Sequence, residues 1–419
     1  MTGTRTLTTI LINSDQQMNK TLLPYLTVLL VFVTASNALA QREHDERPTI
    51  ENFKGIQYTG DDSTFYINFR FRMQSRLKYI SAAGDDLSAE SLEARIRRLR
   101  LRMDGYIYNP KLSYSIQLGF TRGDQDYDDT DVPNLVRDAV IFYNFTDNFY
   151  VAFGLNKLPG NRQRVNSSGE LQFAERSLVN ATFNVDRDFG IKAYYSPKIG
   201  SVPIRLKGAI STGEGRVANM TDDGLAYTGR AEFLPLGEFT NGGDYYEGDL
   251  EYEETPKLSI GGGYSFNDRT TRVHGQTGGF LGVPLTLKTS FYDAIFKYRG
   301  WAYQVEYMKR DVDDPISIDD EGATTHAFKG QGVNQQLSYV FNREAGYELA
   351  GRYTWIKPHD DIRALEVQTD VIELGLTKYF RAHRLKLQLN AHYQVADGIY
   401  DTDHAGNHWG GTFQIELGI

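Results

Sequence analysis

The sequence predicts an all-β protein, a 16-stranded antiparallel transmembrane β-barrel with one connection folded into its interior. Apolar and polar residues alternate from about residue 64 to the last residue, as in strands with one face in lipid and one in water. No run reaches the roughly 18 to 20 apolar residues that a transmembrane helix needs. The 27 tyrosines and 40 glycines, with only 12 prolines, also favour strands over helices.

The N-terminus has the layout of a secretory signal peptide. Lys20 precedes an apolar run at residues 22–33, and the sequence ALA at residues 38–40 ends just before Gln41. This layout predicts export, and together with the predicted barrel it places the protein in the outer membrane of a Gram-negative bacterium. The predicted organisation is a misassigned start (1–17), a signal peptide (18–40), a short periplasmic segment (41–62) and the outer-membrane β-barrel (63–419).

Charge and composition exclude several functional classes. The chain holds 54 acidic and 45 basic residues, a net charge of −9. Cleavage after residue 40 removes two basic residues and one acidic residue, which leaves 43 against 53 and a net charge of −10. So acidic a chain argues against a nucleic-acid partner. It has no cysteine, which excludes disulfides and thiol chemistry.

The strands are predicted from period-2 alternation. In residues 65–76, Phe65, Ile67 and Phe69 share one face, whereas Arg70 and Arg72 lie on the other. Such segments recur about every 24 residues, a spacing that suits tilted membrane strands of roughly 9 to 11 residues with their connections. The 16 segments begin near residues 64, 92, 111, 136, 148, 187, 202, 226, 257, 287, 301, 333, 346, 366, 384 and 410.

A soluble β-sandwich would also alternate, but it fits the sequence less well. The polar faces carry too many charged and amide side chains for the inside of a sandwich. The apolar faces end in aromatic pairs such as Phe149-Tyr150 and Tyr379-Phe380, which are typical of the girdles at a membrane interface.

Arginine is concentrated on one predicted strand, RIRRLRLRMDG at residues 95–105. In a barrel, Leu101 faces lipid while the arginines on either side of it face a water-filled lumen. The adjacent pair Arg97-Arg98 breaks the alternation and predicts a β-bulge. A purely structural alternative is pairing of these arginines with luminal carboxylates on neighbouring strands. The predicted pore-lining residues are Arg70, Arg72, Arg76, Arg95, Arg97, Arg98, Arg100 and Arg102.

Residues 158–186 lack a clear period of two and are predicted to fold inward and narrow the pore. Within them, SGELQFAERSLVN at residues 168–180 predicts a short helix, with Ser167 or Ser168 as its N-cap. The charged residues predicted in or beside this connection are Lys157, Arg162, Arg164, Glu175, Arg176 and Arg187.

Several of these pieces, taken in order, resemble the phosphate-selective outer-membrane porins O and P. The Arg-rich strand is similar to the family's second strand, and FGLNKLPGNRQR (153–164) to its Gly-x-x-Lys-x-Pro segment. LQFAERSLVN (171–180) resembles its Phe-x-Glu-Arg-Ser element, and DRDFGIK (186–192) its Arg-Asp-x-Gly strand start. The resemblance implies a 16-stranded, usually trimeric barrel whose third extracellular loop folds into the lumen, where arginines and lysines draw anions inward.

The resulting expectation is passive diffusion of small anions, phosphate or polyphosphate among them. The expected partners are outer-membrane lipid, lipopolysaccharide and small anions, and the expected assembly is a homotrimer. An alternative is a non-selective or sugar-permeable general porin, because acidic residues on later strands are also expected on luminal faces and would oppose the basic wall. These are Glu306, Glu348, Glu373 and Glu416.

A structural or enzymatic barrel is a remote alternative. No G-x-S-x-G occurs, and no nucleophile pairs convincingly with a histidine, so no catalytic residue is predicted. Residues 124–131 lack the glycine and glutamate of a calcium loop. His404 and His408 lie in a predicted loop and make a poor metal site. We therefore expect neither a metal nor a cofactor.

Overall fold

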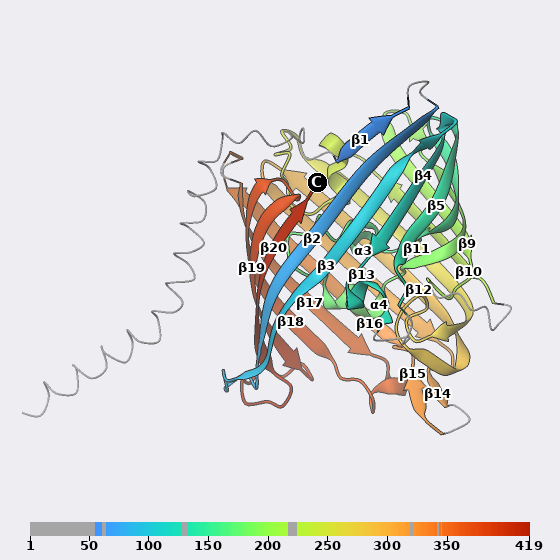
Figure 1. Cartoon of the computed structure of the whole chain (residues 1–419). Coiled ribbons are helices and arrows are strands. Elements are labelled where there is room, and N and C mark those ends of the chain that lie inside the picture. The colour runs from blue at the N-terminus through green and yellow to red at the C-terminus, as the bar shows by residue number, and fades with distance from the viewer. Residues whose placement is uncertain are drawn as a thin grey trace, which may run out of the picture. The chain divides into compact units, whose positions relative to one another are not determined.

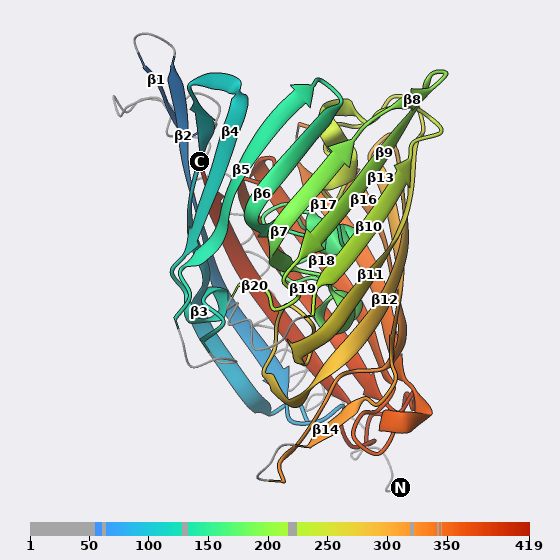
Figure 2. The ribbon, with the colours of Figure 1, turned by 90° about the vertical axis from the view of Figure 1, so that its right-hand side faces the viewer.

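Residues 65–418 contain the barrel, seen in a computed structural model of the chain (Figures 1 and 2). The structure describes residues 55–60, 64–127, 133–216, 224–318, 322–341, 343–344 and 346–419. The predicted start and signal peptide, residues 1–40, lie outside the described residues. None of the described helices is long and apolar enough to cross a membrane.

One antiparallel sheet of 18 strands includes two short ones, β1 (Ile56–Thr59) and β8 (Lys198–Ile199), and the other 16 form the barrel wall. The wall strands are β2 (Phe65–Ser81), β3 (Ala89–Ile107), β4 (Asn109–Gly119), β5 (Val136–Thr146), β6 (Phe149–Lys157), β7 (Arg187–Tyr195), β9 (Val202–Ser211), β10 (Ala226–Phe233), β11 (Lys257–Arg272), β12 (Phe280–Tyr298), β13 (Trp301–Val312), β16 (Gly330–Phe341), β17 (Tyr347–Pro358), β18 (Thr369–Arg381), β19 (Leu385–Ala396) and β20 (His408–Gly418).

Pairing of the first and last wall strands closes the barrel. β2 pairs antiparallel with β20 from Arg72 opposite Gly418 to Ile80 opposite Gly410. Closure leaves no unpaired sheet edge along these residues, as a sheet in lipid requires. The prediction of a 16-stranded antiparallel barrel is therefore confirmed.

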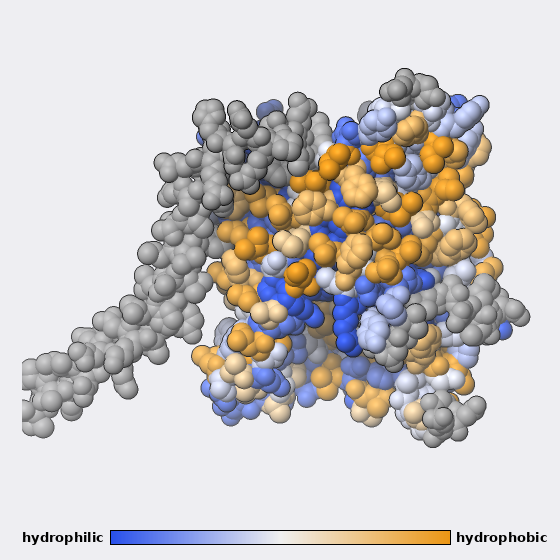
Figure 3. Space-filling view, in the orientation of Figure 1, coloured by the Kyte–Doolittle hydropathy of each residue, from blue (hydrophilic) through white to orange (hydrophobic). Residues whose placement is uncertain are grey.

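Alternation divides each strand between the lumen and the outside. On β10, Thr228 and Arg230 point inward and are buried, while Tyr227 and Phe233 point outward and are 48% and 43% exposed. Hydrophobic residues gather over the outer face of β2 to β5 (Figure 3). The outer surface thus carries the apolar side chains that lipid favours.

Connections at the end of the barrel that holds the C-terminus are mostly tight. Arg299 and Gly300, between β12 and β13, both have positive φ (46° and 86°), as a two-residue turn matched to strand twist requires. We call this end the C-terminal rim; it is uppermost in Figure 1. The connections at the opposite rim are longer and include the two-stranded hairpin of β14 (Ile316–Ile318) and β15 (Thr324–His326).

Most strand starts agree with the sequence pattern, and two expectations need correction. β12 begins at Phe280 rather than near 287, because Gly282 and Pro284 obscure its alternation. Part of segment 41–62 is a strand, β1, which pairs with β2.

Within the described residues, the short helices are not part of the barrel wall. They are α3 (Arg162–Val165), α4 (Leu178–Phe183), and the 3-10 turns η2 (Arg122–Asp124), η3 (Thr240–Tyr245) and η4 (Asp360–Ile362).

Candidate functional site

Residues 158–186, which we call the constriction loop, fold into the lumen between β6 and β7. Apolar side chains fix the loop to the far wall: Val179 and Phe183 are fully buried against Phe291 of β12 and Met308 of β13. Burying side chains of this size contributes about 1.5 to 3 kcal/mol each. The loop is therefore anchored to a hydrophobic cluster on the β12–β17 side of the barrel.

The helix in this loop begins later than the sequence suggests. α4 starts at Leu178, and the N-cap is Ser177, whose hydroxyl accepts from the Asn180 N–H at 3.2 Å. Ser168 is not a cap, because its hydroxyl accepts from Arg72 and Arg100 at 2.7 and 3.0 Å. The predicted helix over 168–180 is wrong because charged wall residues compete for the serine that would have capped it.

A second segment also enters the lumen, from the C-terminal rim. These 23 residues, 234–256, connect β10 to β11, and we call them the rim insert. Buried Lys297 of β12 donates to the carbonyls of Gly243, Tyr246 and Gly248 at 2.5, 2.9 and 2.5 Å. This insertion was not predicted from the sequence.

The rim insert and the constriction loop contact each other. The carboxylate of Glu247 accepts from the Gln163 side chain at 3.0 Å and from the Gln172 N–H at 2.9 Å. The Glu247 N–H donates to the Glu170 carbonyl at 2.9 Å. The two segments together fill one side of the lumen.

A fully buried charge cluster holds the two segments to the wall. Arg162 of the constriction loop contacts Asp293 of β12 at 2.9 Å, Glu232 of β10 at 3.4 Å and Asp244 of the rim insert at 3.7 Å. All four side chains are 0% exposed. Arg162 is thus part of the packing between segments, not of an open surface.

Most of the acidic wall that the sequence suggested does not face the open lumen. Glu306 and Glu348 are 0% exposed, and Glu416 is 1% exposed. Glu306 accepts from the Gln163 N–H of the constriction loop at 3.3 Å, and the rim insert passes over Glu348 at Gly248. Glu373 is paired with Arg352. The two inserted segments thus cover Glu306 and Glu348, two of the four carboxylates expected to oppose the arginines.

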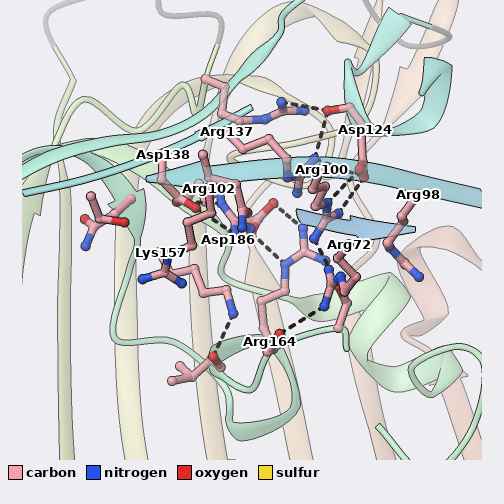
Figure 4. Close-up of a pocket in the computed structure, with 18 of the residues that line it drawn as sticks. Arg72, Arg98, Arg100, Arg102, Asp124, Arg137, Asp138, Lys157, Arg164 and Asp186 are labelled. Atoms are coloured by element: carbon pink, nitrogen blue, oxygen red, sulfur yellow. Dashed lines mark hydrogen bonds and ion pairs between the residues drawn. The ribbon is translucent and has the colours of Figure 1, made fainter. Parts of the chain in front are cut away.

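On the other side, next to β2 to β6, the lumen keeps a cavity of about 450 Å³ (Figure 4). A hollow of about 130 Å³ shares Arg70, Arg72, Arg100 and Arg102 with it and reaches Ile419 at the C-terminal rim. The larger cavity is lined by eleven arginines and one lysine against five carboxylates. The cations are Arg70, Arg72, Arg97, Arg98, Arg100, Arg102, Arg137, Lys157, Arg164, Arg176, Arg187 and Arg216, and the carboxylates are Asp124, Asp126, Asp138, Glu170 and Asp186.

Strand register stacks the arginines in pairs. Arg72 lies opposite Arg100, and Arg70 lies opposite Arg102, in the β2–β3 ladder. The register shifts between Gln74 and Ser75 of β2, so that Arg97 has no opposite residue. The predicted bulge at Arg97-Arg98 is therefore present.

Some of these cations have carboxylate partners. Arg100 donates to Asp124 at 2.6 and 2.5 Å, and Arg187 to Asp138 at 2.9 and 3.2 Å. Burial alone would raise the pKa of Asp124, but Arg100 and Arg137 outweigh burial and hold this pKa well below its usual range. The Asp124 carboxylate is therefore ionised at neutral pH.

Two cations on the loop side lack such partners. Lys157 donates to the carbonyls of Val165 and Asn166 at 2.7 and 2.9 Å, and Arg176 donates to those of Gln163 and Asn166 at 2.7 and 2.8 Å. Within the described residues neither forms an ion pair. Backbone carbonyls orient both charges without neutralising them.

The predicted residues divide between the cavity and its surroundings. Arg95 is exposed, pairs with Glu93 on its own strand and does not line the cavity. Arg76 is buried, donates to Gln414 and does not line the cavity. Arg162 and Glu175 do not line the cavity either, whereas the other ten predicted residues do, and Arg187 belongs to β7 rather than to the loop.

Two arginines of the cavity lining, Arg137 and Arg216, were not predicted from the sequence. Arg137 is the second residue of β5, and the register shift opposite Leu118 hides its inward direction. Arg216 follows β9 in a connection with no periodic signal.

Known proteins share both the sequence pattern and the barrel. A family model described as phosphate-selective porin O and P matches residues 67–408. An Aquifex aeolicus (strain VF5) protein described as uncharacterized is 24% identical over 364 residues, 78% of this chain and 81% of its own. In structure, Salmonella typhi OmpF aligns with a TM-score of 0.51 at 13% identity, over 87% of this chain and all of that one.

The Vibrio cholerae outer-membrane protein OmpT aligns with a TM-score of 0.50 at 11% identity, over 87% of this chain and all of that one. These structural likenesses concern the fold. The family match covers most of the closed barrel, and the resemblance drawn from the sequence motifs is thereby confirmed. The chain belongs to the phosphate-selective porin O and P family and is a porin of the bacterial outer membrane.

Proposed function

We propose that this porin is an anion-preferring channel for passive diffusion of small solutes, phosphate among them. The observation that carries the proposal is the lining of the open cavity, with twelve cationic side chains against five carboxylates. The burial of Glu306 and Glu348 supports it, because both carboxylates are covered by inserted segments. The excess of seven positive charges then acts on solutes with little opposition.

The chemistry of the lining suits oxyanions. A guanidinium group presents paired N–H donors that match two oxygens of a phosphate, and a lysine ammonium adds a compact point charge. Charge in a narrow, water-filled path between low-dielectric walls raises the local concentration of counter-ions. The partners of Arg100 and Arg187 keep that field moderate, so that an anion can leave as well as enter.

The direct test is the reversal potential of the purified protein in a planar lipid bilayer under a KCl gradient. An anion-preferring channel gives a potential close to that of chloride. A reversal potential near zero would instead support the non-selective or sugar-permeable general porin. Replacing chloride with phosphate in the same membrane then measures whether phosphate is carried.

Family resemblance also implies an assembly. We propose a homotrimer embedded in outer-membrane lipid and lipopolysaccharide, with the arginine-lined cavity present once in each subunit. The mass of the detergent-extracted complex tests this proposal: three chains per particle are expected, and one chain would contradict it.

A further inference from the structure

Glu175 of the constriction loop stands among three arginines of the wall. Its Oε1 accepts from Arg76 Nη1 at 2.5 Å and from Arg97 Nε at 2.7 Å, and its Oε2 accepts from Arg98 Nη2 at 3.1 Å. Arg76 comes from β2, and the β3 bulge turns both of the adjacent arginines toward the same carboxylate. The bulge therefore has a specific effect, which is to build a three-arginine group around one negative charge.

This group borders the conducting cavity without closing it. Arg97 and Arg98 line the cavity, but Glu175 does not, and its side chain is 40% exposed. Arg98 Nε is buried and has no hydrogen-bond partner among the described residues. A solute in the cavity thus meets two guanidinium groups that already hold a carboxylate on another side.

A carboxylate and an oxyanion solute use the same donors. Both present paired, negatively charged oxygens to a guanidinium fork. Each donor that points at Glu175 is withheld from a passing anion, and the negative charge of Glu175 lowers the local potential. The carboxylate is therefore positioned as an intramolecular competitor for the solute.

We propose that Glu175 is a tethered anion that sets how strongly Arg97 and Arg98, the two members of this group that line the cavity, hold a solute during passage. This inference rests on the proposed anion preference of the channel. With Glu175 present the group binds anions weakly and releases them quickly. Without Glu175 the group binds anions more tightly and releases them more slowly.

A purely mechanical role as a latch for the loop is the competing explanation, and the backbone contacts argue against it. Arg352 donates to the Glu175 carbonyl at 3.0 Å, and Arg76 donates to the Ala174 carbonyl at 3.0 Å. The Ala174 N–H donates to the Asn390 side chain at 2.9 Å. These bonds hold the chain here without the Glu175 carboxylate.

The experiment compares Glu175→Gln with Glu170→Gln in planar bilayers. Glutamine keeps the shape of residue 175 and removes its charge. Glu170 lines the same cavity and forms no ion pair among the described residues, so its substitution removes a charge without freeing a guanidinium. Glu175→Asp, which keeps the charge, serves as the second reference, and heat-modifiable gel migration checks that each variant folds.

We expect Glu175→Gln to lower the phosphate concentration at half-maximal conductance by about fivefold, which equals about 1 kcal/mol. Its maximal conductance should fall and its anion preference should rise, while Glu170→Gln changes half-saturation by less than twofold and Glu175→Asp stays near wild type. Higher conductance with lower anion preference in Glu175→Gln would identify a latch and overturn the proposal. Equal shifts in the two glutamine variants would also overturn it, by reducing the effect to net charge.

The wild-type control separates this inference from the proposed function. If the wild type has no anion preference, the proposed function fails, whatever the glutamine variants do. If the wild type prefers anions and Glu175→Gln matches it in half-saturation, only the tethered-anion inference fails.

Discussion

The two sides of the lumen use the same kinds of charged residue in opposite ways. On the side of β9 to β19, Arg162, Glu232 and Asp293 are 0% exposed and satisfy one another beneath the inserted segments. On the side of β2 to β6, Arg70 and Arg102 keep 29% and 44% of their side-chain surface exposed around a cavity. A charged residue on the luminal face of a strand therefore does not by itself indicate a role in conduction, because an inserted segment can cover it.

Removing the rim insert should have the largest effect on the difference between the open and the filled side of the lumen. Replacing residues 238–253 with a short Gly-Ser linker removes the contacts of Lys297 and Glu247 and opens the filled side. We expect single-channel conductance to rise by roughly two- to threefold and the anion preference to fall, because a wider path lies partly beyond one Debye length of its wall. Single-channel recordings of the folded variant measure both quantities, and unchanged conductance would show that the insert does not limit the path.

Neutralising part of the open side should have the next largest effect. In the triple variant Arg98→Ala, Arg100→Ala and Lys157→Ala, the excess of cations over carboxylates in the cavity lining falls from seven to four. We expect the anion-to-cation permeability ratio to drop roughly two- to fourfold without closure of the pore. The drop should shrink in 1 M salt, where the Debye length is about 3 Å. Reversal potentials at low and high salt are the measurement, and an unchanged ratio at low salt would make the arginine ladder a structural feature only.

Comparable substitutions on the two sides should lower the free energy of unfolding by different amounts. Lys297→Met leaves three backbone carbonyls without their buried donor and should lower the free energy of unfolding by about 3 kcal/mol. Arg102→Met removes a largely exposed side chain and should cost less than about 1 kcal/mol. Urea unfolding followed by tryptophan fluorescence in lipid vesicles compares the two, and equal losses would contradict the division into a packed side and an open side.

A smaller effect is expected outside the lumen. Leu101 lies on the lipid face of β3, opposite Phe71 of β2. Leu101→Arg should destabilise the barrel by about 2 kcal/mol or more if the site is near the bilayer midplane, and much less near an interface. Its anion preference should equal that of the wild type once folded. A changed preference would show that the side chain at 101 reaches the lumen.

Much of the wall could be predicted from the sequence, because alternation is a local property. The positions of β2 and β3, the bulge at Arg97-Arg98 and the inward face of Arg100 all follow from residues that are close in the chain. Only β12 starts far from its predicted position, where Gly282 and Pro284 interrupt the pattern.

The filling of the lumen could not be predicted in the same way. Residues 234–256 contain seven carboxylates and no lysine or arginine, a composition typical of an exposed loop. Their burial depends on Lys297 of β12 and Arg162 of the constriction loop, which lie far away in the sequence. For the same reason Glu306 and Glu348 were expected in the channel and are covered instead.

The central claim is that solutes pass along the arginine-lined side and not along the filled side. The chain has no cysteine, so a thiol reagent can react only at a cysteine introduced by substitution. Gln117→Cys places a thiol in the cavity lining, and Gln336→Cys places one on β16 at a luminal site that is 2% exposed. A negatively charged methanethiosulfonate reagent should reduce the current through Gln117→Cys and leave Gln336→Cys unchanged. Block of Gln336→Cys without block of Gln117→Cys would contradict the account.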